Sequence, residues 1–145
     1  MKKHLLLSVL LYVLTFDTVS AQTIYDVRFS NPSSHYAEVD MHLKNMPRDS
    51  FDVKMPVWIP GSYMVREFSR HVEGFKAIGT DGSKIRFKKV RKNVWRVYND
   101  SAQALTISYR IYAFELTVRT SFIDAEQAYI NGPSMFMYTE ETRQR

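Results

Sequence analysis

The sequence predicts an all-β protein, built as a β-sandwich or as strongly twisted antiparallel sheets of about eight to nine strands. Three observations support this. Apolar and polar residues alternate along most of the chain after residue 21, which is the period of a strand with one buried face. The 3.6-residue period of an amphipathic helix is missing there. Clusters of Gly, Pro, Asn, Asp and Ser separate the alternating runs at short intervals.

Residues 1–21 have the three parts of a bacterial-type secretory signal peptide. Lys2 and Lys3 supply the positive start, residues 5–16 are apolar but too short to span a bilayer, and Val19-Ser20-Ala21 suits a cleavage site. We therefore expect an exported protein, periplasmic or extracellular, with no membrane span after signal cleavage.

Cleavage leaves 124 of the 145 residues, which is enough for one domain. Lys2, Lys3 and Asp17 leave with the signal, so the net charge falls from +5 to +4. There is no cysteine, so no disulfide can form, and nine Tyr and nine Phe must help to build the core by burial. We assign residues 22–138 to the β-rich domain and residues 139–145 to the start of a connection.

The first half of this domain predicts three regular strands, over residues 23–30, 35–44 and 51–57. The second is the clearest, because Ala37, Val39, Met41 and Leu43 alternate with polar residues. A less regular strand is expected over residues 68–78.

The second half predicts further strands, joined by turns. Asp81-Gly82 is typical of a type I′ hairpin turn. Strands are expected over 85–90, 94–98, 105–113 and 116–122, and a final extended stretch over 128–138 that is broken at residues 131–133.

Residues 55–71 differ most from an ordinary strand. Pro56 and Pro60 lack amide donors, so this run belongs at a sheet edge or at the exit of a strand. Pro60-Gly61 fits the centre of a type II turn. Polar and aromatic side chains follow this turn and form a candidate contact surface: Ser62, Tyr63, Arg66, Glu67 and Arg70. The alternative is a structural corner in which Arg66 and Arg70 pair with nearby carboxylates.

Three other features are open to two interpretations. Arg119 suits a bidentate carboxylate clamp or an ordinary ion pair. Asn131-Gly132 can present backbone groups to an extended peptide at an open edge, or form a bulge. The basic run 84–92 resembles a nucleic-acid or anionic-surface patch, but an edge hairpin whose lysines block aggregation is favoured, and no nucleic-acid partner is expected.

No catalytic site can be built from this chain by a local motif. After the signal peptide only His35, His42 and His71 remain, and none forms the two-histidine helix motif of a zinc hydrolase. There is no serine elbow and no cysteine nucleophile. The chain alone is therefore expected not to be an enzyme and to need no cofactor.

Several motifs, in this order, resemble the N-terminal domain of the glycyl-aminopeptidase-type metallopeptidases (peptidase family M-sixty-one). The most specific is the run from Pro56 to His71, which contains Trp58, Pro60-Gly61-Ser62-Tyr63 and Arg66. The others are Asn31-Pro32 with His35-Tyr36, Lys92-Asn93-Val94-Trp95, Tyr109-Arg110-Ile111-Tyr112-Ala113, Val118-Arg119-Thr120-Ser121 and Ala128-Tyr129-Ile130-Asn131-Gly132.

The resemblance implies that a thermolysin-like catalytic domain with a His-Glu-x-x-His zinc helix, and commonly a PDZ domain, follow a saddle-shaped β domain of this kind. The parent would be a zinc metallo-aminopeptidase, with zinc in the catalytic domain that is missing here. The partners implied are that domain and a peptide substrate. The β domain would pack on the catalytic domain and form part of the cleft wall, where Glu67 could bind an α-amino group and an arginine could orient a carboxylate.

A second hypothesis belongs to another functional class. The chain could be a free-standing exported β-sandwich that binds peptide, glycan or cell envelope through the basic hairpin and exposed aromatic residues. The two hypotheses differ in what lies beyond residue 145, and in whether an apolar interdomain face is left open.

Overall fold

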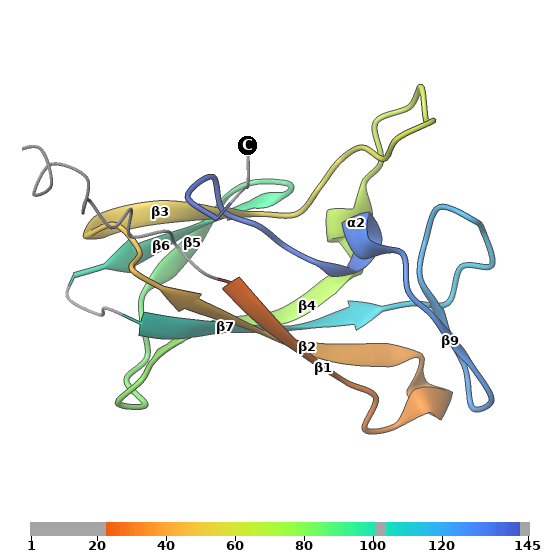
Figure 1. The fold of residues 1–145 in the computed structure, drawn as a ribbon, viewed down its shortest axis with the longest axis horizontal. Helices are drawn as coiled ribbons and strands as arrows, with labels where there is room; N and C mark the ends of the chain where they lie inside the picture. Colours follow the sequence, from red (N-terminus) through yellow and green to blue (C-terminus); the bar gives the residue numbers. More distant parts are fainter. Residues whose placement is uncertain (1–22, 101–103, 143–145) are drawn as a thin grey trace, which may run out of the picture.

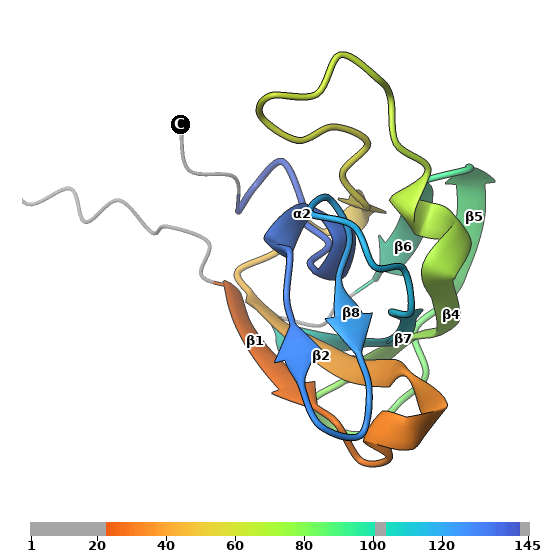
Figure 2. The ribbon, with the colours of Figure 1, turned by 90° about the vertical axis from the view of Figure 1, so that its right-hand side faces the viewer.

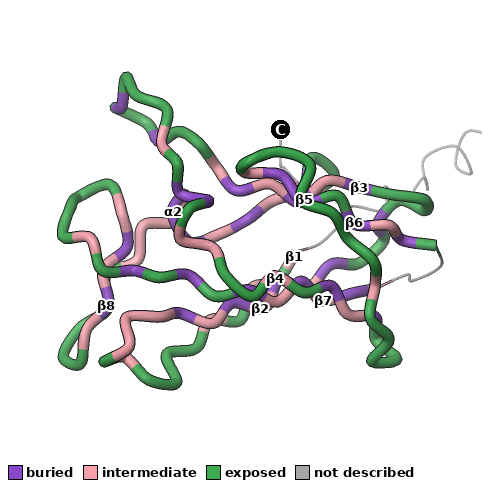
Figure 3. Tube along the Cα trace, turned by 180° about the vertical axis from the view of Figure 1, so that it is seen from behind, coloured by how far each residue is buried: buried purple, intermediate pink, exposed green. Residues whose placement is uncertain are grey.

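The fold is all-β, as the alternation predicted. The computed structural model describes residues 23–100 and 104–142, so the predicted signal peptide lies outside the described residues. Nine strands are found in the described part, and they form three antiparallel sheets without a barrel. The two larger sheets make two layers with the buried residues between them (Figures 1 and 3).

The larger sheet has the strand order β1-β2-β7-β4. Its strands are β1 (Thr23–Arg28), β2 (Tyr36–Lys44), β7 (Ala104–Tyr112) and β4 (Val72–Gly79). The alternation in β2 and β7 is regular, and their inward residues are almost fully buried. Strand β4 is less regular because a bulge between Glu73 and Lys76 contains Gly74, whose φ is +62°.

The second sheet has the order β3-β6-β5, formed by β3 (Asp49–Lys54), β6 (Val94–Asn99) and β5 (Phe87–Arg91). A two-stranded ribbon pairs β8 (Phe122–Ile123) with β9 (Ala128–Tyr129). Short helical turns complete the fold: η1 (Pro32–Ser34), η2 (Phe68–His71) and α2 (Gly132–Met135).

The C-terminal segment is part of the core. Met135 and Met137 are fully buried, and the buried Tyr109 hydroxyl donates to the Met135 carbonyl and accepts from the Met137 amide, both at 3.1 Å. The Tyr25 hydroxyl donates to the Met137 carbonyl. Burial raises the pKa of Tyr25 to about 12, so this phenol keeps its proton at neutral pH.

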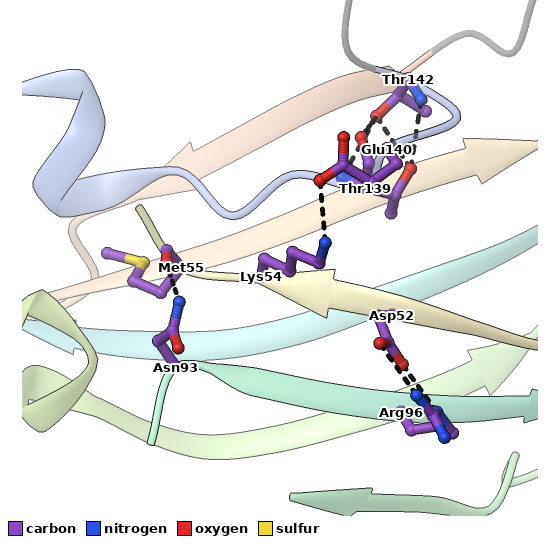
Figure 4. Close-up of polar contacts among 8 residues, drawn as sticks. All are labelled: Asp52, Lys54, Met55, Asn93, Arg96, Thr139, Glu140 and Thr142. Carbon is purple, nitrogen blue, oxygen red and sulfur yellow. Dashed lines mark hydrogen bonds and ion pairs between the residues drawn. The ribbon is translucent and has the colours of Figure 1, made fainter. Parts of the chain in front are cut away.

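The same segment then joins the second sheet. Lys54 and Tyr138 exchange backbone hydrogen bonds of 2.8 and 2.9 Å, and the Lys54 ammonium pairs with Glu140 at 2.8 Å (Figure 4). Thr139 is buried, and its hydroxyl lies 3.0 Å from that of Thr142 within a turn. Residues 139–142, assigned from the sequence to the start of a connection, therefore pack onto the domain.

The final stretch over 128–138 is broken as predicted, and the break is the helical turn α2, which starts beside a proline and extends to Met135. Two other local predictions were wrong. Residues 116–122 are mostly a loop, because the hydroxyls of Thr117 and Thr120 bond nearby backbone groups in place of a strand partner. Asp81-Gly82 does not form a type I′ turn, because Gly82 has a positive φ and Asp81 does not.

Candidate functional site

The structure confirms the turn predicted at Pro60-Gly61. The turn lies in a projecting loop, residues 57–66, named here the Pro-Gly loop (Figures 1 and 2). Gly61 has a φ of +77°, and the Ser62 amide donates to the Ile59 carbonyl at 3.2 Å, as a type II turn requires. At the base, the Arg66 amide donates to the Val57 carbonyl at 2.7 Å. Below the loop, the side chain of Asn93 donates to the Met55 carbonyl at 2.9 Å (Figure 4).

Within the Pro-Gly loop, some side chains hold the loop and others face solvent. Ile59 and Ser62 are buried, and the Trp58 indole donates to the Ser62 carbonyl at 2.6 Å. Tyr63 is fully exposed, and Met64 and Val65 are 63% and 74% exposed. This part of the loop therefore offers apolar surface that the domain itself does not cover.

A second exposed loop, residues 114–121, is named here the threonine loop. The hydroxyls of Thr117 and Thr120 lie 2.8 Å apart, and Thr117 also accepts from the Arg119 amide at 3.1 Å. Leu116 and Val118 are 83% and 79% exposed. Their alternation predicted a buried strand face, whereas the loop turns both side chains to solvent.

The two loops and η2 enclose a cavity of about 240 Å³, named here the arginine pocket. Its lining includes four predicted site residues, Arg66, Glu67, Arg70 and Arg119, which come from two separate parts of the chain. Ser62 and Tyr63 lie outside the lining, although the Ser62 hydroxyl accepts from Arg66 at 3.4 Å.

An ion pair between Arg70 and Glu115 joins the two walls of the arginine pocket. The Arg70 Nε also donates to His71 Nε2 at 2.9 Å, which requires an unprotonated nitrogen on the imidazole. Burial lowers the pKa of His71, Glu115 at 3.6 Å opposes this shift, and Arg70 adds to it. His71 is therefore neutral at pH 7, and Arg70 pairs with a carboxylate as the structural-corner interpretation expected.

Arg66 and Arg119 differ from Arg70. Neither forms a salt bridge with a carboxylate among the described residues, and the buried Arg66 Nε has no hydrogen-bond partner there. Glu67 is already paired with Lys92 at 2.7 Å, and this contact lowers the pKa of its carboxyl. The arginine pocket therefore has an excess of positive charge, which suits an acidic group.

Asn131 and Gly132 lie outside the lining of the arginine pocket, at the start of α2. The Asn131 carbonyl accepts from the Ser134 amide at 3.0 Å, and the Gly132 carbonyl accepts from Phe136 at 2.8 Å. These carbonyls are therefore bonded within the chain. The Asn131 side chain donates to the Val118 carbonyl at 3.3 Å and so holds the threonine loop.

Sequence reasoning missed Glu115 and the buried serine pair beneath the loops. The Ser121 and Ser134 hydroxyls lie 2.9 Å apart, and Ser134 also accepts from the Ser121 amide. The predicted strand over 116–122 hid the role of Ser121, and no local signal links it to Ser134 or links Glu115 to an arginine 45 residues away.

Neither a metal cluster nor a membrane helix occurs in the part of the chain that the structure describes. No group of three or more His, Asp or Glu side chains in residues 23–100 and 104–142 is placed to hold a metal ion. In the same ranges, no helix has the length and hydropathy needed to cross a bilayer.

Comparison with known proteins identifies the family. Residues 24–145 match the family described as Peptidase M61 N-terminal domain. A search of curated proteins found no match. Among solved structures, the aminopeptidase N family protein from Idiomarina loihiensis is similar, with a TM-score of 0.76 and 29% sequence identity over 82% of this chain. The matched part is 20% of that protein's chain. With its all-β layers and a match from residue 24 to residue 145, the chain belongs to the Peptidase M61 N-terminal domain family.

Proposed function

We propose that this chain is the non-catalytic N-terminal domain of an exported zinc aminopeptidase. In the complete enzyme it packs against the catalytic domain and forms part of the substrate cleft wall. Two findings support the proposal: the family match, and the fact that the similar aminopeptidase N family protein is about five times as long as the part matched. The export component rests on the predicted signal peptide in residues 1–21.

The observation that carries the proposal is the apolar surface at one end of the domain. Trp58, Met64 and Val65 on the Pro-Gly loop and Leu116 and Val118 on the threonine loop are all more than half exposed. The two loops project from the same end of the molecule, beside α2 (Figures 1 and 2). Exposed apolar groups gathered in this way are typical of a surface that another domain covers.

The arginine pocket gives this surface its polar specificity. Arg66 and Arg119 lie between the two apolar loops and have no carboxylate partner among the described residues. We propose that they bind a carboxylate of the catalytic domain or of the peptide substrate. Glu67 is a weaker candidate for binding a substrate amino group, because the Lys92 ammonium already occupies its carboxylate.

The first test is to sequence the DNA downstream of codon 145. A continuing reading frame with a His-Glu-x-x-His helix is expected, because zinc would belong to the catalytic domain. A stop codon with no zinc motif in a nearby frame would contradict the proposal and leave an exported binding module.

The second test replaces Arg66 and Arg119 separately by alanine in that longer product. Removing a charged hydrogen-bonding partner should lower kcat/KM about tenfold, or lower the melting temperature by several degrees if the partner is the catalytic domain. Arg48→Ala is the control, since this exposed arginine lies in the loop before β3. If both variants keep wild-type kinetics and melting temperature, the arginine pocket has neither role.

A further inference from the structure

The two edges of the second sheet differ. At the β3 edge, Tyr138 pairs with Lys54 through two backbone hydrogen bonds, so the C-terminal segment covers part of that edge. At the β5 edge, no strand in the described part of the chain lies beside β5. All five residues of β5 are exposed.

The register shows which backbone groups of β5 face this open edge. The Tyr98 amide donates to the Arg86 carbonyl at 2.9 Å, so these two residues form a hydrogen-bonded pair. Bonded and non-bonded pairs alternate along an antiparallel ladder, which makes Lys88 and Arg96 the next bonded pair. The backbone groups of Phe87 and Lys89 therefore point away from β6 and are available to another strand.

A groove of about 390 Å³ lies beside the C-terminal half of β5, and is named here the basic groove. Lys89, Val90, Arg91 and Lys92 line one side, and Glu67, Ser69 and Arg70 line the other. The open edge therefore borders a hollow bounded by η2 and not a flat surface, so an added chain would have contacts on two sides.

The charge of this edge is strongly positive. Residues 84–92 contain six basic residues and no acidic one. Lys92 pairs with Glu67, whereas the other five form no salt bridge among the described residues. The charge of Arg91 helps to lower the pKa of Asp52, but the two do not form a salt bridge. The Asp52 carboxylate already accepts two hydrogen bonds from Arg96 (Figure 4).

We propose that the β5 edge binds an extended acidic polypeptide segment, which adds a fourth strand to this sheet. The backbone of Phe87 and Lys89 would supply main-chain hydrogen bonds, and the unpaired cations, above all Lys88 and Arg91, would bind alternate carboxylates of the segment. Positive charge on an edge strand strongly repels a basic strand and only weakly discourages pairing with a neutral, aggregation-prone one. The same charge attracts an acidic strand. This binding edge differs from the proposed docking surface on the loops, although Glu67 and Arg70 line both the basic groove and the arginine pocket.

The test uses the purified chain and a fluorescein-labelled hexapeptide that alternates glutamate with threonine and has blocked ends. Fluorescence anisotropy should show saturable binding at low salt and at least about tenfold weaker binding at 0.5 M salt. A peptide with lysine in place of glutamate should not bind. A peptide of unchanged charge with alternate amides N-methylated should bind at least about tenfold more weakly, because strand addition needs those donors.

The variant Lys88→Glu/Arg91→Glu should lose binding. Lys44→Glu/Arg48→Glu makes the same charge change at two exposed sites, the last residue of β2 and the loop that follows it, and should keep binding. Hydrogen exchange of the Phe87 and Lys89 amides in the unmodified chain should slow when the acidic peptide is added. This readout does not depend on any variant folding. Absence of binding, equal binding of the N-methylated peptide, or self-association through β5 without peptide binding would each overturn the proposal.

Discussion

Replacing Tyr109 by phenylalanine tests whether the C-terminal segment is held in the core by one hydroxyl group. Tyr109 is only 2% exposed, and its hydroxyl bonds both the Met135 carbonyl and the Met137 amide at 3.1 Å. Burial raises the pKa of this phenol, so it stays protonated and keeps donating. The substitution removes no carbon atom and leaves the fully buried Met137 amide without that acceptor.

An unsatisfied buried amide costs about 1–3 kcal/mol, so the free energy of unfolding should fall by roughly 2 kcal/mol. For a domain of this size, that corresponds to a fall in Tm of roughly 8 °C. Urea unfolding followed by tryptophan fluorescence measures the first quantity, and a thermal scan measures the second. Tyr63→Phe is the matched control, because that hydroxyl is fully exposed and should change neither value. A Tyr109→Phe variant as stable as the control would refute the reasoning.

Three other substitutions have defined outcomes. Gly61→Ala should lower the free energy of unfolding by about 1 kcal/mol, because alanine is strained at a φ of +77°. No atom lies within 4 Å of the added Cβ, so the loss would come from the backbone alone. Gly132→Ala, at an ordinary φ, is the control and should cost less in the same urea assay. Met135→Ala should lower the free energy of unfolding by about 2–5 kcal/mol, since the side chain is fully buried, and a loss below 1 kcal/mol would show that this part of the core is not tightly packed. The folded protein lowers the pKa of His71, so the unfolded chain binds the proton more readily. The free energy of unfolding should therefore fall as the pH drops below about 6.5. His71→Gln should reduce the slope of unfolding free energy against pH. An unchanged slope in unfolding free energy measured between pH 7.5 and 5 would contradict that assignment.

The regular strands could be predicted because their period is visible locally. In β2, each inward residue is apolar and each outward one is polar, so the pattern alone fixes the type of element and its buried face. The Pro-Gly turn was also predictable, because proline and glycine restrict the backbone directly. The basic run was correctly placed at a sheet edge.

The failures arise where side chains replace backbone pairing. Leu116 and Val118 alternate as a strand would, yet the hydroxyls of Thr117 and Thr120 satisfy the backbone locally and leave a loop. The arginine pocket could be predicted only in part, because Arg66 and Arg70 are adjacent to the recognisable turn. Arg119 and Glu115 line the same cavity as Arg66 and Arg70 because two distant segments pack together, and the period of the sequence carries no information about that packing.

The packing of the C-terminal segment has a consequence for the order of events during folding. Tyr25, at the start of the domain, finds its partner at Met137, 112 residues later, and Tyr109 also depends on that segment. A nascent chain can pair β2 with β7 earlier. The core between the two sheets stays incomplete until residues 135–138 have been synthesised. Chain termination shortly before this point would yield a product with its strands largely present and its apolar interior open, which is the form most prone to aggregate or to be degraded.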